Sequence, residues 1–138
     1  MKLVADSSAL VKRYVLEEGS DKIDQFLQNA SQLGLCTILV PEMISALNRR
    51  RREKILSSNN YRTIKKHLME DVHDAVVLQV TPSVISHSVK LLEMNALRAM
   101  DALHIACAIE WKAELFVTAD KRQYDAAQKT GLLTEFIC

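Results

Sequence analysis

Four acidic residues in this sequence fall where one predicted secondary-structure element gives way to the next. Carboxylates that converge on one place repel one another and are costly to desolvate, so such a cluster indicates a cation that neutralises it. Oxygen ligands of this kind favour magnesium or manganese. One such ion, or a pair about 4 Å apart, can activate water and stabilise both oxygens of an in-line phosphodiester displacement. The predicted catalytic and metal-binding residues are Asp6, Glu42, Asp101 and Asp120.

Each of these acids also has a structural explanation, and taken singly that explanation is the stronger one. An aspartate at a helix start caps free N–H groups, and a glutamate in the first turn complements the helix dipole. Capping explains the whole set less well, because serine, threonine and asparagine cap about as well as aspartate. Asp101 is the sharpest case, since it interrupts the apolar segment Ala99–Leu103 and a buried acid there needs a partner.

Several polar residues beside these acids have two open interpretations. Ser7 and Ser8 cap the following helix or orient a neighbouring carboxylate, and Thr118 has similar options. We count Ser8 and Thr118 as supporting residues of the site. His104 follows the third acid by one helical turn, but a single histidine on an apolar helix is typical of the core, so we predict a core residue. Asp125 is predicted to lie on the surface, with a supplement to the acidic cluster as the alternative.

Short apolar runs and amphipathic segments alternate along the chain. The apolar run that begins at Leu3 and ends on Asp6 is typical of a buried strand in a parallel sheet. Gly34 is expected to break the chain before the second strand. The further predicted strands are Cys36–Val40, Ala75–Val80, Glu114–Thr118 and a short Glu135–Ile137. The predicted helices are Ala9–Leu16, Ser20–Ser31, Pro41–Arg52, Tyr61–Asp74, a helix opened by Thr81 and Pro82, Ala99–Lys112 and Lys121–Thr130.

This alternation of strands and helices predicts an α/β fold. Right-handed crossovers between the strands place helices on both faces of a central parallel sheet. We therefore predict a three-layer α/β/α arrangement with four or five strands, in a single domain that spans residues 1–138. In such sheets ligands bind beyond the carboxyl ends of the strands, and the four acids are expected at that edge.

The composition is that of an ordinary globular protein, with 49% apolar and 25% charged residues among 138. No apolar run is long enough to cross a bilayer and nothing resembles a signal peptide, so we expect a cytoplasmic protein with no membrane partner. The formal charge of +1 argues neither for nor against a nucleic-acid partner. Cys36, Cys107 and Cys138 are odd in number and far apart, which indicates small core residues and no zinc site.

Four segments of the chain together resemble the PIN domain family, and within it the VapC-like toxins of bacterial and archaeal toxin–antitoxin modules. No single segment is specific, but the four in this order cover essentially the whole chain. The segments are Val4–Val11, Pro41–Leu47, Arg98–Ala106 and Phe116–Lys121.

The resemblance implies a PIN-like fold and endoribonuclease activity. It implies that the four acids hold magnesium or manganese and that Ser8 supports them. The implied reaction is metal-assisted hydrolysis of RNA without a covalent enzyme intermediate. It also implies a homodimer, and a cognate antitoxin that buries a peptide over the active site.

A run of four arginines, Arg49–Arg52, follows Glu42 by two helical turns or more. Several of them could face the phosphate backbone of an RNA at the carboxyl edge of the sheet, and the candidates are Arg49, Arg50 and Arg52. The alternative is a solvated helix face or salt bridges to an acidic partner. Because consecutive residues point to all sides of a helix, at most two can share one surface.

Other functions of the same fold fit the sequence less well. A signalling receiver domain would carry its acceptor aspartate after the third strand, where this chain has Val80 and Thr81. The three glycines are too far apart to form a glycine-rich phosphate loop. A haloacid-dehalogenase-like phosphatase would need a second aspartate where Ser8 stands. The open alternative is a non-catalytic PIN-fold domain that binds RNA or a protein without cutting.

Overall fold

The computed structural model describes all 138 residues and contains one five-stranded sheet. The strands are β1 (Lys2–Ala5), β2 (Gln32–Cys36), β3 (Val76–Leu78), β4 (Leu115–Thr118) and β5 (Thr134–Phe136). Their order is β3-β2-β1-β4-β5, and every neighbouring pair is parallel. The first strand therefore lies in the middle of the sheet.

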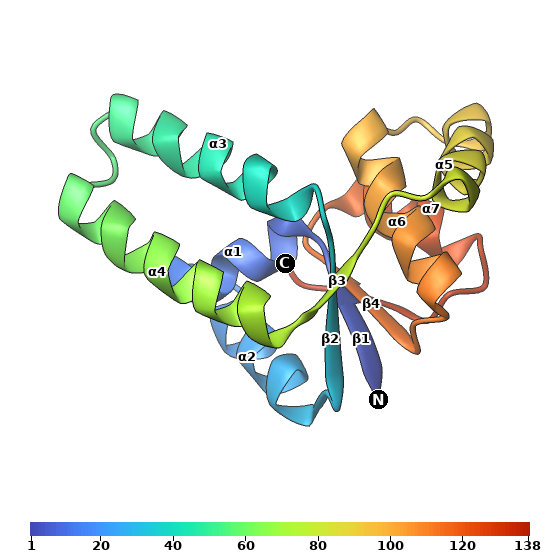
Figure 1. Cartoon of the computed structure of the whole chain (residues 1–138), viewed down its shortest axis with the longest axis horizontal. Helices are drawn as coiled ribbons and strands as arrows, with labels where there is room; N and C mark the ends of the chain where they lie inside the picture. The colour runs from blue at the N-terminus through green and yellow to red at the C-terminus, as the bar shows by residue number, and fades with distance from the viewer.

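Helices cover both faces of the sheet, which Figure 1 shows nearly edge-on between two helical layers. One face carries α1 (Ser7–Tyr14), α2 (Ser20–Asn29), α3 (Leu39–Arg52) and α4 (Ser58–Asp74). The other carries α5 (Pro82–Met94), α6 (Ala99–Trp111) and α7 (Lys121–Gln128). This confirms the predicted three-layer α/β/α fold with a parallel sheet. None of the helices combines the length and the apolar character that crossing a lipid bilayer requires.

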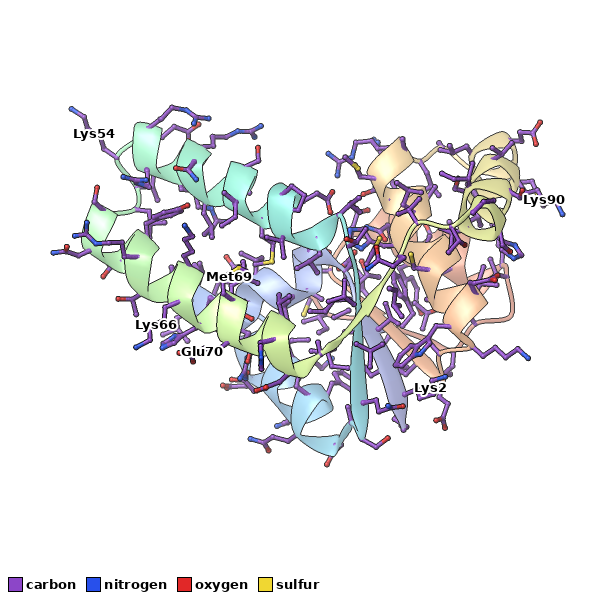
Figure 2. All side chains as sticks on the ribbon, viewed as in Figure 1. Lys2, Lys54, Lys66, Met69, Glu70 and Lys90 are labelled. Atoms are coloured by element: carbon purple, nitrogen blue, oxygen red, sulfur yellow. The ribbon has the colours of Figure 1, made fainter.

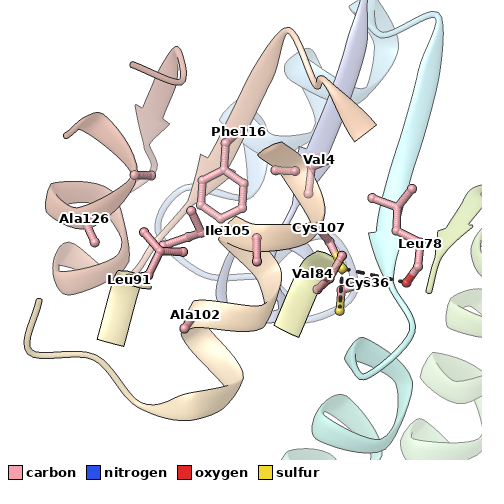
Figure 3. Close-up of a cluster of buried hydrophobic side chains, with 13 residues drawn as sticks. Val4, Cys36, Leu78, Val84, Leu91, Ala102, Ile105, Cys107, Phe116 and Ala126 are labelled. Carbon is pink, nitrogen blue, oxygen red and sulfur yellow. Dashed lines mark hydrogen bonds between the residues drawn. The ribbon is translucent and has the colours of Figure 1, made fainter. Parts of the chain in front are cut away.

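Successive residues of the central strand pack into opposite halves of the core, as the pleat of a strand requires. Leu3 and Ala5 belong to a buried cluster shared with α1–α4, and Val4 belongs to a cluster shared with α5–α7. Figure 3 shows the second cluster, in which Phe116 of β4 lies beside Ile105 of α6. Because β1 is buried on both faces from Leu3 onward, its residues Leu3–Ala5 are continuously apolar.

Two of the three cysteines lie in this second cluster (Figure 3). Cys36 of β2 and Cys107 of α6 are each 1% exposed, and their Sγ atoms are 3.4 Å apart as free thiols. Cys138 is exposed, so the prediction of a core residue is wrong there. The reason is that the chain end turns inward only as far as Ile137, which is fully buried.

The second strand lies four residues before its predicted place. β2 spans Gln32–Cys36, so Gly34 is inside the strand and does not break the chain. A Cβ atom at Gly34 would lie 2.6 Å from Cζ3 of Trp111, so glycine lets α6 pack closely on the strand. The segment Ile38–Val40, predicted as strand, instead caps and begins α3, where Leu39 is fully buried. Tertiary packing overrides the local strand preference of this segment.

Other elements differ from the prediction mainly at their ends. α1 begins at Ser7, two residues earlier than predicted, because the Asp6 side chain caps it. α4 begins at Ser58, three residues early, because Ser57 caps it. β3 is shorter than predicted, since it is an edge strand that pairs only with β2.

The strand order changes direction between β1 and β4. From β1 the chain continues to β2 on one side, and from β4 it continues to β5 on the other. Connections that leave in opposite directions open a crevice beyond the strand ends. Asp6 follows β1 at this point, and Thr118 ends β4.

Candidate active site

Asp6 is fixed at the end of β1 by three hydrogen bonds. Its Oδ1 accepts from the Ala9 amide at 2.9 Å and from Ser8 Oγ at 2.8 Å, and its Oδ2 accepts from Thr118 Oγ1 at 2.5 Å. The side chain is completely buried, and this burial raises its pKa, although the charge of His104 and the hydrogen bonds oppose the rise. One lone pair of Oδ2 receives no donor. Asp6 is therefore a helix cap that can still accept a cation.

The two hydroxyl residues predicted to support the site join β4 to α1. Ser8 Oγ accepts from the Ala119 amide at 2.9 Å, and Thr118 Oγ1 accepts from the Asp120 amide at 3.0 Å. Both hydroxyls also donate to the Asp6 carboxylate. They hold that carboxylate and the turn after β4 in one hydrogen-bonded unit.

Glu42 lies in the first turn of α3 and faces the start of α1. Its Oε1 accepts from Ser7 Oγ at 2.7 Å and lies 2.6 Å from His104 Nε2. Burial raises the pKa of Glu42, but the hydrogen bonds from His104 and Ser7 and the charge of His104 outweigh it, so the pKa lies below its usual value. Its Oε2 has no protein donor and is a free ligand atom.

His104 lies in the core, as predicted, but it also contacts one of the four acids. It is 1% exposed on α6, and its Nε2 contacts Glu42 of α3. Burial lowers the pKa of His104. The hydrogen bond to Glu42 and the negative charges of Asp6 and Glu42 raise it by more, so the pKa lies above its usual value. Its Nδ1 is buried without a protein partner. The sequence gives one indication that His104 lies near the site: it follows Asp101 by three residues, on the same side of the helix.

The guanidinium of Arg98 pairs with both Asp101 and Asp120. Arg98 Nε lies 3.2 Å from Asp101 Oδ2, and Arg98 Nη2 lies 3.7 Å from Asp120 Oδ2. Gln123 Nε2 donates to Asp101 Oδ1 at 3.2 Å, while Asp120 Oδ1 caps α7 by accepting from the amides of Arg122 and Gln123. Asp101 is only 4% exposed, and these contacts are the partners that its burial requires. Arg98 and Gln123 were not predicted as site residues, because neither stands out without the fold.

The four predicted acids line one edge of the sheet, but they do not converge on a single point. No group of three or more histidine, cysteine, aspartate or glutamate side chains is placed to hold a metal ion. The donor set nevertheless fits Mg²⁺ or Mn²⁺, because all four groups are carboxylates and each keeps an oxygen lone pair without a protein donor. Arg98 is 75% exposed at its side chain, so a cation would compete with an exposed guanidinium for Asp101 and Asp120.

The arginine run divides between two sides of α3. Arg51 turns towards α4, where its guanidinium carbon lies 4.4 Å from the centre of the Tyr61 ring. Arg49 and Arg52 are exposed, and Arg50 is half-buried. None of these three takes part in an ion pair. Their contact with RNA stays a prediction.

The chain is similar to known proteins in sequence pattern and in fold. The family model of the PIN domain matches residues 3–129, whereas no curated protein matches the chain. DNA-bound VapBC from Salmonella typhimurium covers 100% of this chain and 99% of its own, with a TM-score of 0.71 and 14% identity. VapBC2 from Rickettsia felis, bound to a promoter DNA fragment, covers 100% of both chains with a TM-score of 0.70 and 12% identity. VapC20 from Mycobacterium tuberculosis, a Sarcin-Ricin loop cleaving toxin, covers 95% of this chain and 96% of its own, with a TM-score of 0.69 and 12% identity.

Proposed function

Because this chain belongs to the PIN domain family, we propose that it is a metal-dependent endoribonuclease that hydrolyses RNA phosphodiester bonds. The observation that carries this proposal is the set of four carboxylates along the carboxyl edge of the sheet, three of them linked through Thr118, Gln123 and Arg98. An all-oxygen set of this kind suits Mg²⁺ or Mn²⁺.

We further propose that the protein is the toxin of a type II toxin–antitoxin module. Its structural neighbours include toxin–antitoxin complexes and a toxin that cleaves the Sarcin-Ricin loop, which supports an antitoxin partner and an RNA substrate. The proposal includes a single PIN domain over residues 1–138, a homodimer, and action in the cytoplasm, where the RNA substrate is found.

Different groups of the protein hold each of the proposed ligands in place. Asp6, Glu42, Asp101 and Asp120 would hold the metal, which would activate water and stabilise charge on the reacting phosphate. Asp6 cannot swing away, because Ser8, Thr118 and the Ala9 amide hold both of its oxygens. Glu42 is oriented through Oε1, which leaves Oε2 for the cation. Arg98 would move from Asp101 and Asp120 as the cation binds.

The activity is tested by incubating the purified protein with structured RNA and either Mg²⁺ or Mn²⁺. We expect cuts that a chelator abolishes and that an excess of metal restores, because the metal would lower the pKa of the attacking water and stabilise the charge on the reacting phosphate. A metal-induced rise in melting temperature is also expected, since binding to the folded state stabilises it. The absence of both effects would favour the alternative, a PIN-fold domain that binds RNA or a protein without cutting.

We propose that His104 is a positioning residue for Glu42. His104→Ala leaves Glu42 with Ser7 as its single donor, so we expect cleavage to fall about 10- to 100-fold, with a higher metal concentration needed for half-maximal rate. The measurement is the cleavage rate as a function of Mg²⁺ or Mn²⁺ concentration.

His104→Gln is the matched control, because its amide can still donate a hydrogen bond to Glu42. Partial rescue of the metal dependence by glutamine would support the positioning role. Equal losses in both variants that follow only their melting temperatures would show instead that His104 acts through packing.

A further inference from the structure

The exposed side of α3 leads from the candidate active site to a basic tip. Arg49 and Arg52 follow Glu42 by seven and ten residues, so all three lie on the same side of the helix. Ser45, between them, is exposed, as are both arginines. At 1.5 Å per residue, Arg49 lies about 10 Å and Arg52 about 15 Å along the axis from Glu42. A linear ligand that leaves the site along α3 would pass both arginines.

The tip carries positive charge that the protein does not neutralise. Five of the six residues from Arg49 to Lys54 are basic, with Glu53 as the single acid, whereas the whole chain has a formal charge of +1. Arg49, Arg52 and Lys54 take part in no ion pair. Figure 2 shows Lys54 at the far end of the hairpin that α3 and α4 form. Concentrated positive charge on an exposed surface attracts phosphate groups.

The backbone at the tip would suit glycine better than the lysine it carries. Lys54 has a φ of 61°, in the left-handed region, and directly follows the last turn of α3. There the Ile55 amide donates to the Arg50 carbonyl at 2.9 Å and closes the helix. Glycine adopts this conformation without the steric cost of a Cβ atom. The lysine therefore weakens the turn while it adds a charge at the end of α3 that lies farthest from Glu42.

From these observations we infer that Arg49, Arg52 and Lys54 form a basic arm that binds the phosphate backbone of the substrate RNA beyond the cleavage site. The inference rests on the proposed function and deepens it. Because the arm lies about 10–15 Å or more from Glu42, it contacts phosphates several nucleotides from the cut. The preferred substrate is then an RNA whose backbone continues outward on one side of the cleaved bond, and not a very short oligonucleotide.

The arm is tested by the binding of a fluorescently labelled RNA stem-loop to the full chain in chelator, where no cleavage occurs. The variant Arg49→Gln/Arg52→Gln keeps helix-forming residues and removes two charges. The control Lys66→Gln/Lys90→Gln removes two charges from exposed sites on α4 and α5, which Figure 2 shows away from the tip. At 0.1 M salt we expect the arm variant to bind about 10- to 30-fold more weakly, and the slope of log K against log salt to fall by about 1.4.

Lys54→Gly separates binding from folding. We expect this variant to melt at a higher temperature, because glycine relieves the left-handed backbone, and to bind the stem-loop about threefold more weakly. Lower affinity in a more stable protein cannot come from unfolding.

Two results would overturn the inference. One is an arm variant that binds RNA like the control variant, and the other is an unchanged salt slope. Either result would indicate that the arm serves an acidic protein partner or solubility. Binding in chelator does not depend on cleavage, so a protein that cuts RNA but fails this test refutes the arm alone. A protein that binds RNA through the arm but never cuts it would refute the proposed nuclease activity alone.

Discussion

Replacement of Asp101 by asparagine is expected to reduce RNA cleavage by about a thousandfold while the protein stays folded. The loss follows from removing one charged ligand from the proposed metal site, where a metal ion would supply several kcal/mol of transition-state stabilisation. The fold survives because asparagine keeps the oxygen that accepts from Gln123, and because Arg98 keeps Asp120 as its partner. Asparagine gives up the ion pair with Arg98, but that guanidinium is largely exposed, so the pair contributes little and the melting temperature should change little.

The measurement is a cleavage time course in Mg²⁺ or Mn²⁺, together with a thermal melt of each variant. Asp125→Asn is the matched control, since Asp125 lies on the surface, as predicted, where it pairs with Lys121 at 3.1 Å. That variant should cut like the unaltered protein. An Asp101→Asn protein that is unfolded would support a structural role for this acid, and one that cuts normally would exclude it as a ligand.

Replacement of Asp6 by alanine is expected to lower the free energy of unfolding by about 3–4 kcal/mol and to abolish cleavage. Alanine removes the cap of α1 and leaves the hydroxyls of Ser8 and Thr118 and the Ala9 amide without their acceptor. Loss of a cap costs about 1–2 kcal/mol, and each buried donor left unpaired adds about 1 kcal/mol or more. For a chain of this size such a loss is a large part of the total stability.

Asp6→Asn separates the two roles of this residue. Asparagine caps a helix about as well as aspartate and keeps one oxygen, so its stability should stay within about 1 kcal/mol of the original. It should still lose cleavage, because the carboxylate charge is gone. Urea denaturation and the cleavage assay measure the two effects. Equal stabilities for the alanine and asparagine variants would contradict the proposed cap, and cleavage by Asp6→Asn would contradict the proposed ligand.

The order of elements and the place of Asp6 follow from local properties of the chain. A buried strand in a parallel sheet needs a continuous apolar run, and amphipathic helices need the 3.6-residue period, and both are visible in the residues themselves. Alternation of the two then predicts the parallel sheet, which in turn brings its carboxyl ends to one edge. For this reason the α/β/α layers were predictable, and so was the placing of Asp6 and Asp120 at one edge.

The remaining features depend on contacts between residues far apart in the chain. The place of β2 is set by its pairing with β1 and by the packing of Gly34 against Trp111, which no local pattern reveals. The contact of His104 with Glu42 joins residues 62 positions apart, and the link from Arg98 to Asp120 joins two different helix starts. Side-chain pairs of this kind form only after the sheet has brought α3, α6 and α7 together. Local sequence patterns therefore predict which elements form and which acids lie at their ends, whereas the partners that hold those acids follow from packing.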